Sequence, residues 1–184
     1  LIFSNNNTRK SEQGPLMKII LGIDPGSILT GYGLVALANQ NITHIAHGTI
    51  KVQGNSLAEK CFFLFSEIQS IMNEHTPTEV AVEQVFFAKN AQSALKLGQA
   101  RGAMLTAIAS LQKPVYEYTP TQIKKTTTGL GRAGKTQVQQ MIRMLLNLKT
   151  EPQSDAADAL ACAVCHCHHQ GILARIEQAT SQGR

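Results

Sequence analysis

Short apolar runs bounded by turn-forming residues alternate along the chain with longer segments whose apolar side chains recur every three or four positions. Short aliphatic and β-branched runs are typical of buried strands, and the longer period is typical of amphipathic helices. The pattern predicts strands at about 18–24, 31–37, 42–52, 78–83 and 115–118. It predicts helices at about 57–74, 91–111, 138–146 and 153–169. Three successive strands, followed by strands that alternate with helices, indicate an α/β fold: a five-stranded mixed sheet with helices on both faces.

Local signals mark several boundaries of these elements. The first strand ends in the turn Asp24-Pro25-Gly26, since proline fixes φ and glycine permits a positive φ. The segment 39–41 (Asn-Gln-Asn) predicts a hairpin turn between the second and third strands. Ser56 and Glu59 have the spacing of a capping box, which predicts the start of the first helix.

Composition narrows the class of protein. The chain of 184 residues suits one domain, with 1–16 as a disordered N-terminal extension, 17–170 as the folded domain and 171–184 as a polar C-terminal tail. Its net charge of +5 fits a polyanionic partner. No apolar run approaches the roughly 18 residues of a membrane span, and no signal segment is recognisable. We therefore expect a cytoplasmic protein without membrane association, whose four cysteines stay reduced.

Four carboxylates from three separate segments mark the candidate site. Asp24 ends the first predicted strand, and Glu83 ends the fourth. Asp155 and Asp158 are three positions apart, which places both on one face of the last predicted helix. An acid that closes a strand lies at the edge where open α/β sheets bind ligands. If the three segments converge, the four acids share one pocket.

Such a pocket needs compensation for the repulsion among its charges. Two carboxylates about 4 Å apart repel by about 4 kcal/mol at an effective dielectric constant near 20. Raised pKa values or bound cations relieve the repulsion, and oxygen ligands favour hard ions such as Mg²⁺. Two such ions about 3.5–4 Å apart form an arrangement that cuts phosphodiesters. The alternative is that each acid caps a loop or helix end on its own, as Asp155 would near a helix start.

Several sequence blocks, in order from about Met17 to His169, resemble the RuvC family of bacterial Holliday-junction resolvases. The blocks are Gly22-Ile23-Asp24-Pro25-Gly26-Ser27, Glu83-Gln84-Val85-Phe86, Asn90-Ala91, Ser93 to Gly102, and Asp155 to Ala161. The resemblance implies a ribonuclease-H-like fold and a structure-selective endonuclease of DNA recombination and repair, which makes paired symmetric cuts in four-way junctions. It implies two Mg²⁺ ions, with Mn²⁺ as a substitute, on the four acids Asp24, Glu83, Asp155 and Asp158. The implied partners are junction DNA, a second copy of the chain as a homodimer, and the branch-migration proteins RuvA and RuvB.

The resemblance also assigns roles outside the acids. Lys124 and Lys135 match family lysines and would act as catalytic residues that neutralise the phosphate in the transition state. DNA contacts are implied at four positions: Phe86, Lys89, Arg132 and Lys135. We expect Phe86 to be exposed, where it can stack on an unpaired base, and Phe87 to be buried; the alternative is that both belong to the core.

Two phosphate-binding patterns suggest a nucleotide hydrolase instead. Residues 129–136 (GLGRAGKT) satisfy the P-loop pattern, but the preceding segment 122–128 is too polar for the buried strand that a P-loop needs. We expect a flexible glycine loop there, which leads into a helix or holds a DNA phosphate. Residues 22–27 with Gly31 also resemble the first phosphate loop of actin-like ATPases, which need two such halves in a longer chain. A third class, a junction-binding protein without cleavage, would gain nothing from acids that face phosphate.

Two further patterns leave alternatives open. Cys162, Cys165 and His169 have a helical spacing that suits zinc, but structural zinc sites usually join two clusters, and small buried thiols are the simpler interpretation. A row of small residues on the predicted helix 91–111 permits close packing against the sheet of the same chain or the same helix of a second copy. The members of this row are Ala94, Gly98 and Gly102.

Overall fold

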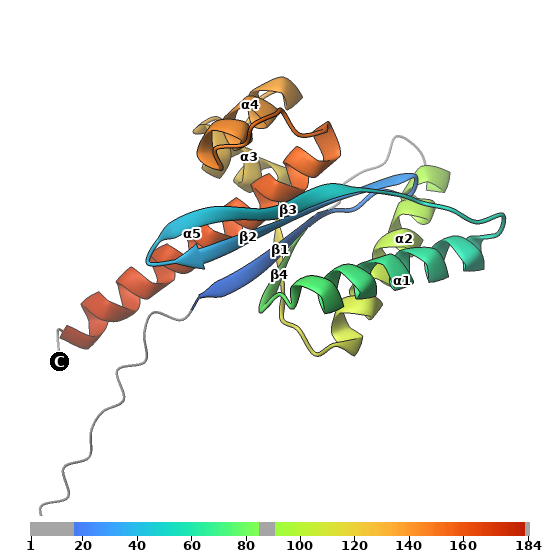
Figure 1. Cartoon of the computed structure of the whole chain (residues 1–184), viewed down its shortest axis with the longest axis horizontal. Coiled ribbons are helices and arrows are strands. Elements are labelled where there is room, and N and C mark those ends of the chain that lie inside the picture. Colours follow the sequence, from blue (N-terminus) through green and yellow to red (C-terminus); the bar gives the residue numbers. More distant parts are fainter. Residues whose placement is uncertain (1–16, 85–90, 183–184) are drawn as a thin grey trace, which may run out of the picture.

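The computed structural model describes residues 17–84 and 91–182, which form a five-stranded mixed sheet with helices on both faces (Figure 1). The strands are β1 (Lys18–Asp24), β2 (Leu29–Ala38), β3 (Asn41–Lys51), β4 (Glu79–Glu83) and β5 (Val115–Tyr118). The helices are α1 (Leu57–His75), α2 (Ala91–Ser110), α3 (Pro120–Thr128), α4 (Lys135–Leu145) and α5 (Ser154–Gln182). In the order β3-β2-β1-β4-β5, the β3-β2 and β2-β1 pairs are antiparallel and the other two pairs are parallel. The predicted fold class is confirmed.

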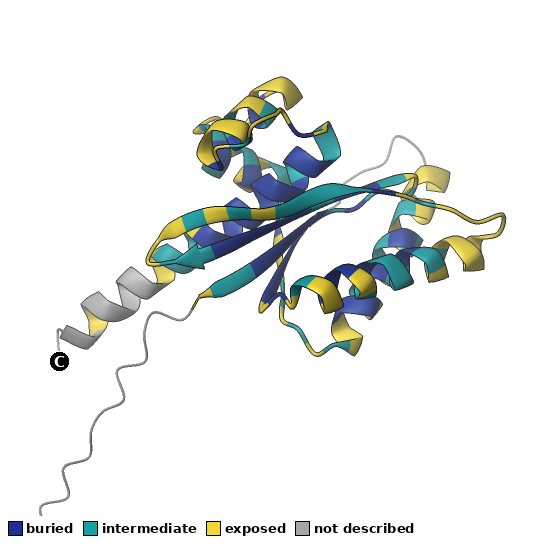
Figure 2. Ribbon diagram, viewed as in Figure 1, coloured by how far each residue is buried: buried dark blue, intermediate teal, exposed yellow. Residues whose placement is uncertain are grey.

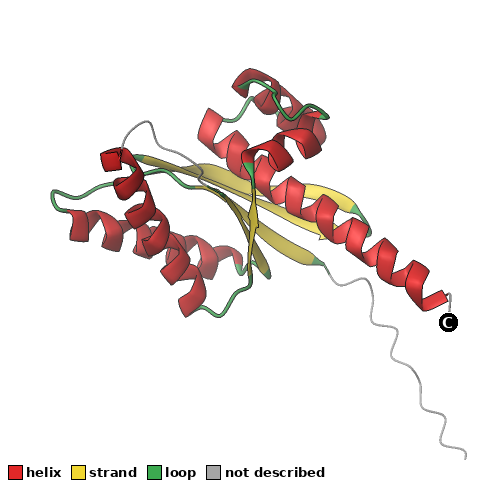
Figure 3. Cartoon of the chain, turned by 180° about the vertical axis from the view of Figure 1, so that it is seen from behind, coloured by secondary structure: helices red, strands yellow, loops and turns green. Residues whose placement is uncertain are grey.

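The sheet separates two apolar cores, because neighbouring side chains on a strand point to opposite faces. Ile20 and Ala81 pack with α3, α4 and α5, whereas Leu21 and Val80 pack with α1 and α2. Figure 3 shows these two groups of helices on either side of the sheet, and Figure 2 shows that the central strands and the first half of α5 are buried. The acids that end β1 and β4 lie an even number of positions after Ile20 and Ala81. Both acids therefore project toward α5.

Two glycines allow α5 to lie close to the sheet. A β-carbon at Gly22 would come within 2.0 Å of the carbonyl oxygen of Ala159. A β-carbon at Gly31 would come within 1.9 Å of the carbonyl oxygen of Asp155. Any larger residue at either position would push the helix away from β1 and β2. These glycines therefore help to set the distance between the first turns of α5 and the strands β1 and β2.

The predicted hairpin turn and helix cap are confirmed, whereas Gly26 in the predicted turn after Asp24 does not adopt a positive φ. Asn39 and Gln40 both have a positive φ, of 50° and 66°, as the two central residues of this type of hairpin turn require. The hydroxyl of Ser56 accepts a hydrogen bond from the backbone amide of Glu59 at 3.2 Å, and α1 begins at the next residue after Ser56. These short-range signals fix the edges of β2, β3 and α1.

Helix α3 is an element that the sequence analysis did not predict. It lies in the polar segment before the glycine loop and begins at Pro120. A capping box starts it, because Thr119 accepts from the amide of Gln122 and the Gln122 side chain accepts from the amide of Thr119. Proline in the first turn adds to this signal. The capping box is present in the sequence, but the segment has too few apolar residues for their spacing to predict a helix.

Helix α5 is longer than predicted. It continues to Gln182 instead of ending near His169, so residues 171–182 of the expected polar tail are helical. The helix formers that follow Gly171 outweigh the roughly 1 kcal/mol that glycine costs inside a helix. None of the helices within residues 17–84 and 91–182 is both long and apolar enough to cross a membrane. The extension predicted at 1–16 lies outside the described residues.

Candidate active site

The carboxyl ends of β1 and β4 lie side by side, and each strand ends in an acid. Ile23 pairs with Val82 in parallel register, so Asp24 and Glu83 follow as neighbours. The pair from α5, at positions 155 and 158, lies in the first two turns of that helix. All four acids are partly buried. The three segments therefore converge at one edge of the sheet, which is the condition under which the sequence analysis expected a shared pocket.

Two lysines reach the same place from separate helices. Lys124 belongs to α3, and Lys135 is the first residue of α4. A cavity of about 240 Å³ is lined by five of the predicted site residues: Asp24, Glu83, Lys124, Lys135 and Asp158. Asp155 is near enough to raise the pKa of Asp24 through its charge. The six residues predicted to be catalytic thus form one cluster of four acids and two lysines.

Burial and mutual repulsion raise the pKa values of three acids. Burial is the largest cause at Asp24, followed by the charges of the other three acids, and its pKa rises to about 8. Burial and the charge of Asp158 raise the pKa of Glu83 to about 7, against the opposing charges of the two lysines. Burial also raises the pKa of Asp158. Asp24 interacts with every other acid and is the electrostatic centre of the cluster.

The donor set suits a hard divalent cation. The four acids offer only oxygen ligands, and a cation beside Asp24 and Glu83 would favour their ionised forms. In the described part of the chain, no group of three or more acidic, histidine or cysteine side chains is already close enough together to hold an ion. Carboxylates repel one another without a cation, so we expect these side chains to draw together when one binds.

Several residues that the sequence analysis did not single out complete the site. Ile123 and Val138 are buried and form the apolar part of the cavity lining. Thr30 is fully buried, and its hydroxyl donates to the carbonyl oxygen of Gly26 at 2.9 Å and accepts from the Gly26 amide at 3.3 Å. These bonds fix the turn that follows Asp24. Val138 belongs to the predicted helix 138–146, and α3, which holds Ile123, had a sequence signal in the capping box at its start.

The glycine-rich segment 129–136 does not form a P-loop. Helix α3 leads directly into it, with Gly129 as its C-cap at a φ of 77°, whereas a P-loop follows a buried strand. The segment then enters α4, with Gly134 at the N-cap. Lys135 lines the same cavity as the acids, rather than a loop that surrounds a phosphate site. The P-loop interpretation is therefore wrong.

The remaining predicted DNA contacts divide between described and undescribed residues. Arg132 is exposed in the loop between α3 and α4, on the approach to Lys135. Phe86 and Lys89 lie outside the described residues, and so does Phe87. The expected exposure of Phe86 and burial of Phe87 therefore stay predictions.

The cysteines of α5 belong to the core. Cys162, Cys165 and Cys167 are buried, and each is a free thiol. Burial raises the pKa of Cys162 well above its ordinary value. They pack with Ile20 and other residues of the α5 face of the sheet. Within residues 17–84 and 91–182 no three potential ligands of zinc come together, which favours the interpretation as buried thiols.

The row of small residues on α2 is open. Ala94, Gly98 and Gly102 are exposed, and a β-carbon at either glycine would meet no described atom within 4 Å. The sheet of the same chain is therefore not the partner of this row. The second predicted partner, the same helix of another copy, is consistent with this exposure.

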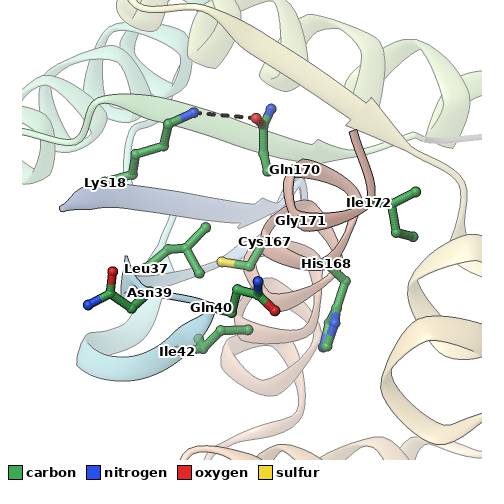
Figure 4. A pocket seen from close by; sticks show the side chains of 10 residues that line it. All are labelled: Lys18, Leu37, Asn39, Gln40, Ile42, Cys167, His168, Gln170, Gly171 and Ile172. Carbon is green, nitrogen blue, oxygen red and sulfur yellow. Dashed lines mark hydrogen bonds between the residues drawn. The ribbon is translucent and has the colours of Figure 1, made fainter. Parts of the chain in front are cut away.

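A larger cavity, of about 580 Å³, lies at the opposite end of the sheet (Figure 4). Lys18 at the start of β1 and the hairpin-turn residues Asn39 and Gln40 line it, together with Cys167 and Gln170 of α5. Its lining contains no carboxylate. The ligand chemistry for a metal-dependent site is thus found in the smaller cavity beside Asp24.

Comparison with known sequences gives matches over most of the chain. The family profile "Crossover junction endodeoxyribonuclease RuvC" matches residues 20–166. RuvC of Acinetobacter baumannii is 48% identical over 160 residues, which are 87% of this chain and 88% of that protein. RuvC of Psychromonas ingrahamii is 51% identical over 152 residues, 83% of this chain and 88% of that protein.

Solved structures show the same fold. Thermus thermophilus RuvC in complex with a Holliday junction substrate matches with a TM-score of 0.77 and 34% identity, over 83% of this chain and 94% of that one. The yeast mitochondrial Holliday junction resolvase matches with a TM-score of 0.69 at 11% identity, over 90% of this chain and 84% of that one. The likeness to both resolvases confirms the predicted ribonuclease-H-like fold.

Proposed function

The chain belongs to the RuvC family of crossover junction endodeoxyribonucleases, and on this premise we propose how it resolves four-way DNA junctions. It hydrolyses phosphodiester bonds of the junction by paired symmetric cuts, in DNA recombination and repair. One observation supports our choice of the active site. Four acids and two lysines, from five separate segments of the sequence, meet where β1 and β4 end.

The acids hold the catalytic ions in this proposal. Asp24, Glu83, Asp155 and Asp158 would hold two Mg²⁺ ions, and Mn²⁺ would be able to replace them. Such ions would activate a water for attack and stabilise the leaving oxygen. Asp24 would be the central ligand, because it interacts with each of the other acids. The raised pKa values of Asp24 and Glu83 support the proposal, since a cation relieves the repulsion that raises them.

The lysines act on the scissile phosphate. Lys124 and Lys135 line the cavity that the acids line, so a phosphate that reaches the ions also reaches both ammonium groups. They neutralise the charge that develops in the transition state. Lys135 also begins α4, and the free amide groups at a helix N-terminus favour an anion. Arg132 extends this contact to a neighbouring backbone phosphate.

The proposed partners follow from the shape of the substrate. A junction cut at two symmetric points suits a two-fold dimer, and the exposed small residues of α2 offer a surface on which two copies can pack closely. Phe86 and Lys89 follow Glu83 in the sequence and are assigned to contacts with the junction. RuvA and RuvB are the proposed partners in branch migration. Chromosomal DNA is the substrate, so the proposed place of action is the bacterial cytoplasm.

A cleavage assay on synthetic DNA tests the function. The protein is incubated with a four-way junction or a matched linear duplex, with Mg²⁺ and without ATP, and the cuts are mapped on all four strands. The expected result is a pair of cuts at symmetric positions in the junction, with the duplex intact. Binding of the junction without cuts would support a binding protein, and a requirement for ATP would support a nucleotide hydrolase.

A further inference from the structure

A chain of hydrogen bonds crosses the core on the same face of the sheet as the acid cluster. The hydroxyl oxygen of Tyr118 lies 2.7 Å from Nδ1 of His166, and Nε2 of His166 lies 2.6 Å from Oε2 of Glu79. Nζ of Lys18 donates to the other carboxylate oxygen of Glu79 at 2.7 Å and to Gln170 at 3.3 Å, and Figure 4 shows the second bond. His166 is fully buried, and Glu79 and Tyr118 are 8% and 7% exposed.

The protons in this series of hydrogen bonds have one consistent arrangement. Burial acts to raise the pKa of Glu79, but hydrogen bonds from Lys18 and His166 hold it below the ordinary value, so the carboxylate is ionised and only accepts. Nε2 of His166 must therefore donate to Glu79. Burial lowers the pKa of His166, which leaves its Nδ1 unprotonated as the acceptor for the hydroxyl of Tyr118. In this arrangement the hydroxyl of Tyr118, both ring nitrogens of His166 and both carboxylate oxygens of Glu79 have hydrogen-bond partners.

The elements joined by these bonds either carry part of the acid cluster or lead directly into a helix that lines the same cavity. β4 begins at Glu79 and ends at Glu83. α5 carries His166 about two turns after Asp158. Tyr118 ends β5, pairs in register with Glu83 and leads directly into α3, the helix that supplies one lysine of the cavity. A shift of α5 along the sheet would therefore break the Tyr118–His166 bond and move an acid relative to Glu83.

Apolar packing alone does not fix such a shift, because the hydrophobic effect has no direction. Hydrogen bonds do have direction, and a buried imidazole or hydroxyl without its partner is costly. We infer that Tyr118 and His166 are positioning residues, whose hydrogen bond holds α5 against the β5–α3 junction so that Asp158, Glu83 and Lys124 face one metal and phosphate site. The identity of the ions in this inference rests on the proposed function.

The substitution Tyr118→Phe tests the inference, since it removes the hydroxyl and keeps the ring. Mn²⁺ binding is measured without DNA by electron paramagnetic resonance, together with kcat and KM for junction cleavage. Changes to partners that orient metal ligands weaken metal affinity or activity by about 10–100-fold. We expect a loss at the lower end of this range, about tenfold, in both Mn²⁺ affinity and kcat, with KM unchanged. His166→Gln keeps an amide donor that can reach Glu79 but has no acceptor at the position of Nδ1, and we expect the same result.

Two controls separate positioning from general loss of stability. Tyr116→Phe makes the same chemical change two residues away, on a ring that also contacts His166, with a centroid separation of 4.5 Å. Ile68→Val weakens the core on the other face of the sheet. Both controls should bind Mn²⁺ like the wild type, whatever their melting temperatures.

The outcomes distinguish this inference from the proposed function. Mn²⁺ affinity of Tyr118→Phe and His166→Gln within twofold of the wild type would overturn the inference, even if the wild type cleaves junctions. An equal loss of affinity in Ile68→Val would overturn it too, because any loosening of the fold would then suffice. If the wild type binds Mn²⁺ but does not cut junctions, the proposed function fails, and the Mn²⁺ affinities of the variants still decide the inference.

Discussion

Asp24 and Glu83 end adjacent parallel strands, and the charge of Glu83 is the largest electrostatic contribution to the raised pKa of Asp24. The register of β1 and β4 holds the two carboxyl groups together before any ion binds, since Ile23 pairs with Val82 one position earlier. The fold thus keeps two carboxylates close enough for the charge of Glu83 to raise the pKa of Asp24.

Asp24→Asn should abolish cleavage. The amide keeps the size of the side chain but removes the central negative ligand, and loss of several kcal/mol of transition-state stabilisation corresponds to a fall of more than about 10²-fold in rate. Junction binding should persist or tighten, because one repulsion against phosphate disappears. Cleavage and gel-shift assays with Mg²⁺ check both parts. Cleavage at a rate near that of the wild type would show that the ions are held elsewhere.

The stability of the metal-free protein should fall as the pH rises from about 4 to about 8. The pKa of Asp24 rises from 3.8 to about 8 and that of Glu83 from 4.5 to about 7, so the folded state binds more protons than the unfolded state in this window. Stability then decreases with pH wherever the folded state holds the extra protons. Mg²⁺ should restore the loss at pH 8, because it stabilises the ionised carboxylates.

Melting temperatures at pH 6 and pH 8, in EDTA and in Mg²⁺, measure this effect. Histidines titrate in the same range, so the comparison is made between the wild type and Asp24→Asn. The wild type in EDTA should lose more stability between the two pH values than the variant does. Equal losses in the two proteins would mean that the folded state does not raise the pKa of Asp24.

Lys135→Ala should lower cleavage by about 10²-fold, the usual effect of removing one group that stabilises transition-state charge. ATP should bind neither the wild type nor the variant, since the segment before Lys135 is a helix–loop–helix connection. Lys125→Ala is the matched control: this lysine is exposed on α3 but does not line the cavity. Calorimetry with ATP that detects saturable binding by the wild type alone would restore the nucleotide interpretation.

The parts of the site that the sequence predicted are those set by local rules. Asp24 and Glu83 were recognisable because strand ends are short-range features, and Asp155 and Asp158 because of their helical spacing. The family resemblance added both lysines. The bond between Glu79 and His166 joins residues 87 positions apart. The spacing of apolar residues along the sequence does not predict such a pair, because the pairing depends on how α5 is aligned with β4. The sequence analysis therefore recognised the buried thiols around His166 but not the histidine itself.

Phe86→Ala should impair cleavage much more than it impairs folding or non-specific DNA binding. Lysines and arginines attract phosphates of any DNA, so they do not distinguish a junction from a duplex. An aromatic side chain three residues after Glu83 can occupy the crossover, where bases unstack easily, at about 1–3 kcal/mol per stacked base. Cleavage and thermal unfolding are compared. A core phenylalanine would instead cost about 3–5 kcal/mol of stability on truncation, with unchanged activity per folded molecule.

Gly98→Leu should have opposite effects on the monomer and on the proposed dimer. No described atom lies within 4 Å of a β-carbon at Gly98, so the substitution meets no clash inside the chain. It should raise the stability of a monomer by about 0.5–1 kcal/mol, the usual gain when glycine leaves an exposed helix position. If two α2 helices pack along the row of Ala94, Gly98 and Gly102, the leucine instead separates their backbones.

Sedimentation equilibrium and thermal unfolding at two protein concentrations distinguish the two effects. We expect a wild-type dimer, a variant that dissociates to a monomer at micromolar concentration, and loss of the second of the paired cuts. Gly171→Leu serves as the control, because Gly171 also lies in a helix with no described atom within 4 Å of its β-carbon. That control should gain stability and remain dimeric. A Gly98→Leu protein that is more stable than the wild type and still dimeric would exclude the α2 row from the interface, because a leucine cannot fit where two helix backbones are in contact.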